Sequence, residues 1–245
     1  MDQRSNAAAL TADFAQLETR LDATIGLAVS VVGSLETPMM LGHWQSGPAW
    51  STMKVPVAIA ALRELDRPKV TDAMIAAITQ SDNAAAEALW QSLGDPVTAA
   101  RKVEAVLRES GDPTIVQSHR IRAEFTAFGQ TEWPLAEQAR FTAIAFCDSR
   151  NAPIFALMND IADHQRWGIG VIPGTRFKGG WGPSPSGDYL VRQIGLLTTP
   201  TGMTAVALAA QPASGSFADG THDLTAIANW LAQHLGDLPA GKCDR

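Results

Sequence analysis

The segment Ser51-Thr52-Met53-Lys54 places a hydroxyl and an amine three residues apart at the start of a helical run. Residues three apart on a helix share a face, so the two side chains can meet. A serine hydroxyl becomes an effective nucleophile when a nearby base takes its proton, and a desolvated amine can act as that base. Backbone N–H groups at a helix start also favour a developing negative charge. Taken alone, however, the segment more often marks a capping serine beside an exposed lysine.

Two later segments combine hydroxyl, amide and amine groups in a similar way. Ser81-Asp82-Asn83 precedes a helical run over residues 84–90, and all three residue types are favoured as helix caps. Lys178-Gly179-Gly180-Trp181 lies in a β-rich segment, where it is by itself typical of a glycine bulge beside a surface lysine. Each segment therefore has a purely structural interpretation when it is considered alone.

The elements that carry these segments follow from hydrophobic periodicity and turn residues. Apolar residues three to four apart in 7–23 predict an amphipathic helix, and the block 52–150 predicts several short helices broken by Pro and Gly. A helix over 221–235 ends at Gly236. The predicted strands are 26–32, 39–44, 177–181, 189–197 and 203–210, the last two forming a hairpin.

This order predicts a mixed α/β chain of the α+β type. Residues 1–48 and 165–245 are expected to form one domain, an antiparallel sheet flanked by the N-terminal and C-terminal helices. Residues 49–164 are expected to form an inserted all-helical domain. The cleft between two such units is a usual place for a small-molecule site.

The order of the three segments along the chain favours a functional interpretation over the structural one that each has alone. Ser-x-x-Lys at a helix start, then Ser-Asp-Asn, then Lys-x-Gly on a late strand is the motif set of serine β-lactamases and penicillin-binding proteins. The chain resembles that superfamily, and most closely the class A β-lactamases, from about residue 26 to residue 235. Gly94-Asp95-Pro96 also stands where that family often has a Gly-x-Pro turn.

The resemblance implies a role for each matching residue. Ser51 would be acylated by a β-lactam or a D-alanyl peptide, with Lys54 as general base. Ser81 would pass a proton to the leaving nitrogen, and Lys178 would keep the site electropositive. Asn83 would bind the substrate's acylamino group. Gly180 and Trp181 would lie against the substrate, with the N–H groups of Ser51 and Trp181 forming the oxyanion hole.

Arg192 is a further candidate from the resemblance. It precedes Gly202 by ten residues, an offset at which many class A enzymes carry an arginine that binds the substrate carboxylate. The guanidinium suits bidentate contact with a carboxylate. The alternative, a solvated arginine on a strand, is about equally favoured.

The sequence departs from the class A pattern at two places. Gly179 stands where the family has a Thr or Ser whose hydroxyl contacts the substrate carboxylate. Glu124, in Arg122-Ala123-Glu124, is the only match to the glutamate that activates the deacylating water, and Phe128 stands where its Asn partner would fall. An exposed loop glutamate is the preferred interpretation of Glu124, and the rival Glu132 is expected in the first turn of the next helix.

Three functions therefore remain open. The first is a class A-like serine hydrolase that acts on β-lactams, with hydrolysis that can be slow. The second is a D,D-peptidase of the penicillin-binding type, with the same acylation step and a different acyl acceptor. The third is a non-catalytic relative that binds a cell-wall or protein ligand, against which the complete set of Ser51, Lys54, Ser81 and Asn83 argues.

Composition excludes several other classes of protein. The 245 residues are 46% hydrophobic and 18% charged, with a net charge of −6 and no dense Lys/Arg tract, so no nucleic-acid partner is expected. No apolar run is long enough for a membrane span. Five scattered histidines and two cysteines predict neither a metal site nor a cofactor, and we expect a monomer.

The two cysteines and the N-terminus bear on location. Cys147 and Cys243 could form one bridge, although we expect free thiols. The first ten residues lack the apolar core of a signal peptide. Because the targets of the resembled family lie outside the cytoplasm, the resemblance implies a periplasmic, cell-envelope or secreted protein.

Overall fold

A computed structural model describes residues 3–243 of the chain, the side chains from residue 6 onward. Single 3-10 turns, among them η1 (Trp50–Met53) and η2 (Phe128–Gln130), connect the main elements. The helices within this range are α1 (Gln3–Arg20), α2 (Lys54–Arg63), α3 (Asp72–Thr79), α4 (Asn83–Ser92), α5 (Pro96–Arg108), α6 (Leu135–Ala145), α7 (Ala152–Leu157) and α8 (Phe217–Gln233). The strands are β1 (Ala23–Val31), β2 (Met39–Gly42), β3 (Arg176–Pro183), β4 (Tyr189–Thr199) and β5 (Gly202–Pro212).

The five strands form one antiparallel sheet in the order β2-β1-β5-β4-β3. The sheet joins the two ends of the chain, because β1 pairs with β5 along its whole length, from Ala23 opposite Pro212 to Val31 opposite Thr204. This pairing confirms the predicted α+β class, with one sheet shared by the first and last strands. The edge strand β3 carries the Lys178 segment.

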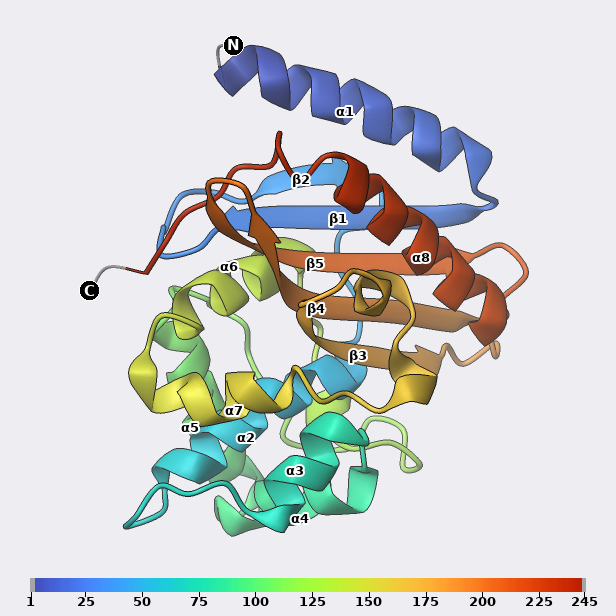
Figure 1. Ribbon diagram of the computed structural model, residues 1–245. Helices are drawn as coiled ribbons and strands as arrows, with labels where there is room; N and C mark the ends of the chain where they lie inside the picture. Colours follow the sequence, from blue (N-terminus) through green and yellow to red (C-terminus); the bar gives the residue numbers. More distant parts are fainter. Residues whose placement is uncertain (1–2, 244–245) are drawn as a thin grey trace.

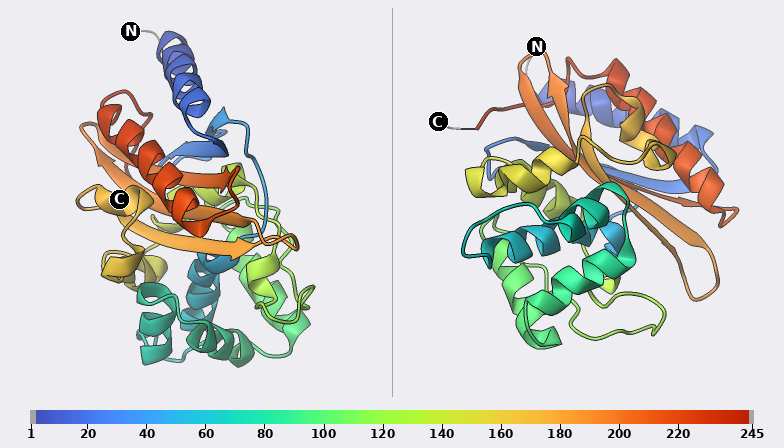
Figure 2. Two further views of the ribbon diagram at one scale, coloured as in Figure 1. Left: turned by 90° about the vertical axis from the view of Figure 1, so that its right-hand side faces the viewer. Right: turned by 60° about the horizontal axis from the view of Figure 1, so that its bottom comes forward.

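Helices cover both faces of the sheet. Helices α1 and α8 lie on one face, and α6 packs against β1, β4 and β5 on the other (Figure 1). Helices α2 to α5 lie beyond β3 on the side opposite α8, and two further views keep this division (Figure 2). Because both faces are covered, residues 205–210 of β5 form an uninterrupted buried apolar run.

Side-chain chemistry accounts for the helix starts that matter for the site. The Asp82 carboxylate accepts a 2.7 Å hydrogen bond from the Ala85 N–H and so caps α4. Asp95 caps α5 in the same way and is followed by Pro96 in the first turn. None of the helices in residues 3–243 is long and apolar enough to cross a membrane.

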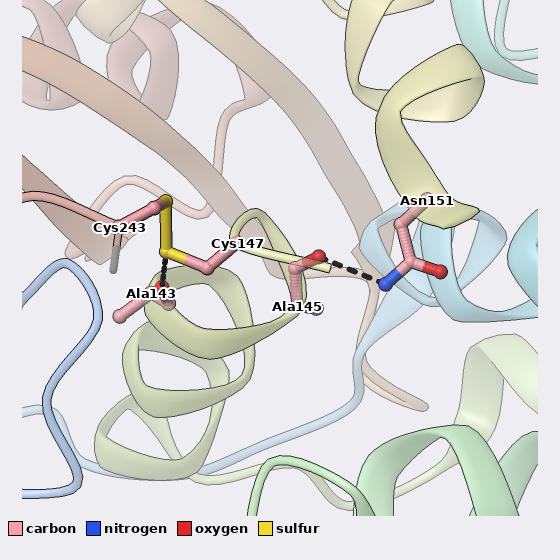
Figure 3. Close-up of a disulfide and its surroundings, with 5 residues drawn as sticks. All are labelled: Ala143, Ala145, Cys147, Asn151 and Cys243. Carbon is pink, nitrogen blue, oxygen red and sulfur yellow. Dashed lines mark hydrogen bonds between the residues drawn. A yellow bond between two sulfur atoms is a disulfide. The ribbon is translucent and has the colours of Figure 1, made fainter. Parts of the chain in front are cut away.

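The two cysteines are joined by a disulfide, which corrects the expectation of free thiols. Cys147, just after α6, bonds to Cys243 in the C-terminal segment, with Cα atoms 5.1 Å apart (Figure 3). Asn151 donates a 2.8 Å hydrogen bond to the Ala145 carbonyl and holds the turn after α6. Ninety-six residues separate the two cysteines, so periodicity and local spacing contain no signal for their pairing.

Candidate active site

A pocket of about 450 Å³ lies where η1, the start of α4, the loop 120–126 and β3 meet. Its lining includes Ser51, Ser81, Asn83 and Trp181, which come from all three sequence segments. The fold therefore brings the segments to one place although more than a hundred residues separate the first from the last.

Ser51 lies in η1, directly before α2, with a partly exposed side chain. Its hydroxyl makes no side-chain hydrogen bond with the described residues, and the bond to Lys54 Nζ that a nucleophile–base pair suggests is not formed. The preceding residue, Trp50, has a φ of +50°. A left-handed backbone is costly for a bulky residue and persists where the surrounding structure enforces it. Such strain is often found next to functional groups.

Lys54 is buried at the first turn of α2 and points toward the Ser81 segment. Its Nζ donates to the Ser81 carbonyl at 2.5 Å, to Asn83 Oδ1 at 2.8 Å and to Ser81 Oγ at 3.3 Å. Only 1% of Lys54 is exposed. The amine is thus fixed by the Ser-Asp-Asn turn and held out of water.

Lys178 reaches the same hydroxyl from the sheet. Its Nζ donates to Ser81 Oγ at 2.8 Å and to the Gly179 carbonyl at 2.8 Å, and the residue is fully buried. Ser81 Oγ therefore accepts from two amines, which leaves its own O–H free to donate. Ser81 has a φ of +57°, the second strained non-glycine residue of the described chain.

Burial shifts the protonation of both amines. Desolvation lowers the pKa of Lys54 to about 7, although the nearby Asp82 carboxylate acts in the opposite direction. Desolvation also lowers the pKa of Lys178 well below its ordinary value, and the positive charge of Lys54 adds to that shift. An amine with a pKa close to 7 is partly neutral at neutral pH, as a general base must be.

Gly180 brings β3 into backbone contact with the nucleophile segment. A Cβ at this position would lie 2.9 Å from Ser51 N and 2.9 Å from Thr52 N. Any other residue would push η1 away from the strand, so glycine is required here by close approach.

Arg192 lies away from the pocket, which corrects its predicted contact with a substrate carboxylate. The side chain is fully buried beneath η1, where it stacks on Trp44 and makes four hydrogen bonds. Its guanidinium donates to the carbonyls of Gly47, Pro48 and Trp133 and to Gln138 Oε1. Burial lowers the pKa of Arg192 to about 9, so the group still carries its charge at neutral pH.

The acidic candidates lie apart from the buried amines. Glu124 lines the pocket, but its side chain is 58% exposed and ion-paired with Arg122 at 3.0 Å. A hydrogen bond from its own backbone N–H, together with Arg122, holds the pKa of Glu124 below its usual value. Glu132 accepts a 2.5 Å hydrogen bond from Ser46 and precedes α6, so the first-turn position predicted for it is wrong. Phe128 is buried against Trp90.

Several pocket residues were not identified from the sequence. Glu87 and Arg120 line the pocket and form an ion pair at 3.3 Å, and Phe125 and Tyr189 add aromatic walls. A signal existed for Glu87, because it follows Asn83 by four residues and so shares its helix face. Arg120, Phe125 and Tyr189 are identified as pocket residues only by the structure, because the loop 120–126 and β4 bring them to the pocket.

The described residues offer little to a metal ion. No group of three or more His, Cys, Asp or Glu side chains within residues 3–243 is arranged to bind one.

Comparison with known proteins identifies the fold. No model of a protein family and no curated protein matches the sequence. The structure is similar to a class A β-lactamase from Bacteroides cellulosilyticus, with 15% identity, coverage of 94% of this chain and 98% of that one, and a TM-score of 0.75. A β-lactamase from Xanthomonas campestris shares 18% identity over 94% of this chain and 99% of that one, with a TM-score of 0.71.

A third structure agrees with these two. A putative class A β-lactamase from Rhodopseudomonas palustris shares 20% identity over 91% of this chain and 99% of that one, with a TM-score of 0.64. The chain thus has the class A β-lactamase fold over nearly its whole length. At this level of identity the comparison establishes the fold alone.

Proposed function

We propose that the protein is a serine hydrolase that is acylated at Ser51 by β-lactams or D-alanyl peptides. The observation that carries the proposal is Ser81 Oγ, which accepts from two buried amines beside the pocket onto which Ser51 opens. A structural cap has no need for two desolvated amines on one hydroxyl, because burying them is costly.

Acylation can be written with these groups alone. The neutral Lys54 amine has two N–H groups, so it gives up one of its three hydrogen bonds and turns its lone pair toward Ser51. Ser51 Oγ then attacks the carbonyl carbon while its proton passes to this amine. As the tetrahedral intermediate collapses, the C–N bond breaks and the leaving nitrogen takes the Ser81 proton. Lys54 returns its proton to Ser81 through their 3.3 Å contact, so both lysines end in their starting state.

Strand β3 supports the oxyanion role of the Trp181 N–H. The Gly179 carbonyl accepts from Lys178 Nζ, so it points away from the pairing with β4. Along a strand, N–H and C=O groups of residues two apart point to the same side, which directs the Trp181 N–H outward as well. An oxyanion donor contributes about 3–4 kcal/mol of barrier lowering in enzymes of this type.

The site lacks a fixed base for deacylation, which favours a long-lived acyl-enzyme. A penicillin-binding function therefore stays a second candidate. Within the described chain, Lys54 Nζ has hydrogen bonds only to Ser81 and Asn83, and no carboxylate contacts it. Glu124 would be the base for a deacylating water, but Arg122 holds it at the exposed rim. Without a fixed base, water attacks the ester slowly.

The disulfide supports export. Bonds of this kind persist in oxidising compartments and are rare in the cytosol of most organisms. With Cys147 and Cys243 joined, a periplasmic, cell-envelope or secreted location fits the chain, in agreement with the location of β-lactam targets.

Time-resolved assays separate the candidate functions. The protein is incubated with a chromogenic cephalosporin, and in parallel with a fluorescent penicillin followed by gel fluorescence. Continuous colour release that Ser51→Ala abolishes supports a hydrolase. A stable fluorescent band with little release supports a penicillin-binding enzyme. The absence of both signals, at millimolar reagent, contradicts the proposal and leaves a non-catalytic relative.

A further inference from the structure

The β3 side of the pocket has no hydroxyl next to Lys178. A Cβ on Gly179 would lie 3.0 Å from Trp167 Cη2 and 3.3 Å from its Cζ2. Trp167 itself packs edge-on against Trp181, with ring centroids 5.8 Å apart. A larger side chain at this position would have to move the Trp167 indole by a few tenths of an ångström, and with glycine here β3 offers no hydroxyl.

The cations near the pocket are already engaged. Lys178 is fully buried beneath Ser81 and does not line the pocket, and Arg192 is bonded to carbonyls under η1. Among the described residues that line the pocket, Arg120 is the single cation. It is paired with Glu87 at 3.3 Å and donates to the Ala123 carbonyl at 3.1 Å. An incoming carboxylate would have to compete with these partners.

Carboxylates, by contrast, face the same space. Glu87 and Glu124 both line the pocket, and each is paired with an arginine, Arg120 at 3.3 Å and Arg122 at 3.0 Å, so neither guanidinium is free to meet an incoming carboxylate. The Glu124 side chain is the more exposed of the two, at 58% against 24% for Glu87. Like charges brought together in a partly enclosed pocket repel one another more strongly than in bulk water.

Four aromatic side chains also line the pocket. Trp50, Phe125, Trp181 and Tyr189 line the pocket, with Trp50 and Phe125 in edge contact at 5.0 Å. Aromatic walls favour flat, uncharged groups through burial and ring stacking.

We propose that the pocket selects acyl donors whose leaving group is aromatic and uncharged, and that it discriminates against leaving groups that carry a carboxylate. This inference rests on the proposed acylation of Ser51 and names the substrate class of that same site. It makes β-lactams and D-alanyl peptides slow acylating agents, because both carry a carboxylate on the leaving-group side.

The reaction with an aromatic thioester balances with water as the second reactant. Ser51 Oγ attacks the thioester carbonyl while its proton passes to Lys54. The C–S bond then breaks, the thiol leaves with the proton from Ser81, and Lys54 returns a proton to Ser81. Water then hydrolyses the Ser51 ester to the free acid and restores the hydroxyl.

Two N-benzoylglycyl thioesters provide a matched test, one of 3-mercaptobenzamide and one of 3-mercaptobenzoate. They share the acyl group and the ring and differ in the charge of one substituent. The measured quantity is kcat/KM from thiol release, which reports the steps up to acylation for the free enzyme. We expect the amide to be preferred about tenfold, a ratio that falls as salt is added.

Two variants locate the source of the discrimination. Glu124→Gln should reduce the preference severalfold, and Glu124→Lys should remove or invert it. Asp66→Asn removes one negative charge, as Glu124→Gln does, at an exposed residue that does not line the pocket. It should leave the ratio of the two kcat/KM values as it is.

The outcomes separate the inference from the proposed function. If the benzoate is used as well as or better than the benzamide, the inference is overturned while the acylation of Ser51 stands. If neither thioester forms an adduct that Ser51→Ala abolishes, the proposed function and the inference fall together. A preference for the benzamide that survives Glu124→Lys contradicts the electrostatic cause.

Discussion

Ser81 accepts hydrogen bonds from both buried lysines of the site, Lys54 of α2 and Lys178 of β3. Its carbonyl and hydroxyl accept from Lys54, its hydroxyl accepts from Lys178, and its backbone is left-handed. The neighbouring Asp82 caps α4, so one triplet contains both a structural cap and two pocket residues. The cap and the chemistry are therefore not alternative interpretations of this segment, because different residues of the triplet perform them.

The protonation of Lys54 predicts how acylation depends on pH. With its pKa lowered to about 7, the amine is protonated in acid and becomes a base as the pH rises. The rate of labelling by a fluorescent penicillin should therefore increase through neutral pH and then level off. Since Lys178 lies beside the same hydroxyl, the apparent midpoint belongs to the pair.

Lys54→Ala provides the control for this profile. It should slow labelling about 10²–10⁴-fold, the usual contribution of a general base, and remove the rise near neutrality. A labelling rate that is flat or falls with pH in the unmodified protein would contradict the role of Lys54.

The carboxylates at the pocket allow a paired test of deacylation. We expect Glu124→Gln to leave the release of a penicilloyl group from Ser51 nearly as it is, because Arg122 holds this side chain at the rim. A positioned base contributes about 10²–10⁴-fold, so a change under about tenfold excludes that role. Intact mass during a chase without reagent measures the release.

Glu87→Gln is the matched variant, since Glu87 lines the same pocket and is also paired with an arginine. Accumulation of the adduct in one variant alone would identify that glutamate as the base, contrary to our expectation. Acylation itself should persist in both variants.

At the scale of elements, the paired strands β3 and β4 hold η1 and the chain just before it. Gly180 touches the backbone of η1, and the residue paired with it on β4, Arg192, reaches under η1 to bond with three carbonyls and Gln138. The guanidinium thus holds the chain just before η1, and Gln138, which accepts from it, donates to Thr52 Oγ1 at 2.8 Å. We infer that Arg192 positions Ser51 without contacting the substrate.

Arg192→Ala tests this positioning role. It leaves buried carbonyls without donors, and since an unsatisfied buried group costs about 1–3 kcal/mol, we expect a loss of at least about 3 kcal/mol in the free energy of unfolding. Urea denaturation measures it. Arg101→Ala, on the exposed side of α5, is the control and should change stability by less than about 0.5 kcal/mol. Full stability with a raised KM would restore the substrate role.

Sequence patterns predict the elements well and the orientation of side chains poorly. Alternation and turn residues located every strand, and the spacing of Leu10, Phe14 and Leu17 located α1, because burial on one face leaves a local periodic signal. Arg192 has no such signal. Whether a strand arginine faces the substrate or the core depends on which carbonyls the fold places beneath it.

At the scale of the whole molecule, the disulfide ties the C-terminal segment to the end of α6. The division into domains and the monomeric state stay predictions. The predicted sheet domain covers 1–48 and 165–245, of which residues 1–2 and 244–245 lie outside the described range, and the predicted helical domain covers 49–164. The pocket between the sheet edge and the helices is compatible with this division.

Removing the disulfide should destabilise the fold without blocking acylation. Closing a loop of this length restricts the unfolded chain, and native disulfides contribute about 2–4 kcal/mol. We expect the double variant Cys147→Ser/Cys243→Ser to unfold at lower urea and still be labelled by penicillin, since neither residue lines the pocket. Thiol counting under denaturing conditions is the check, and two free thiols in the unmodified protein would contradict the bond.

The most direct test of the account is to find which residue carries the acyl group. The protein is treated with a millimolar penicillin, digested, and mapped by tandem mass spectrometry. We expect one adduct, on the hydroxyl at position 51, that is absent after Ser51→Ala and much reduced after Lys54→Ala. An adduct on another residue, or one that survives Ser51→Ala, would contradict the central claim.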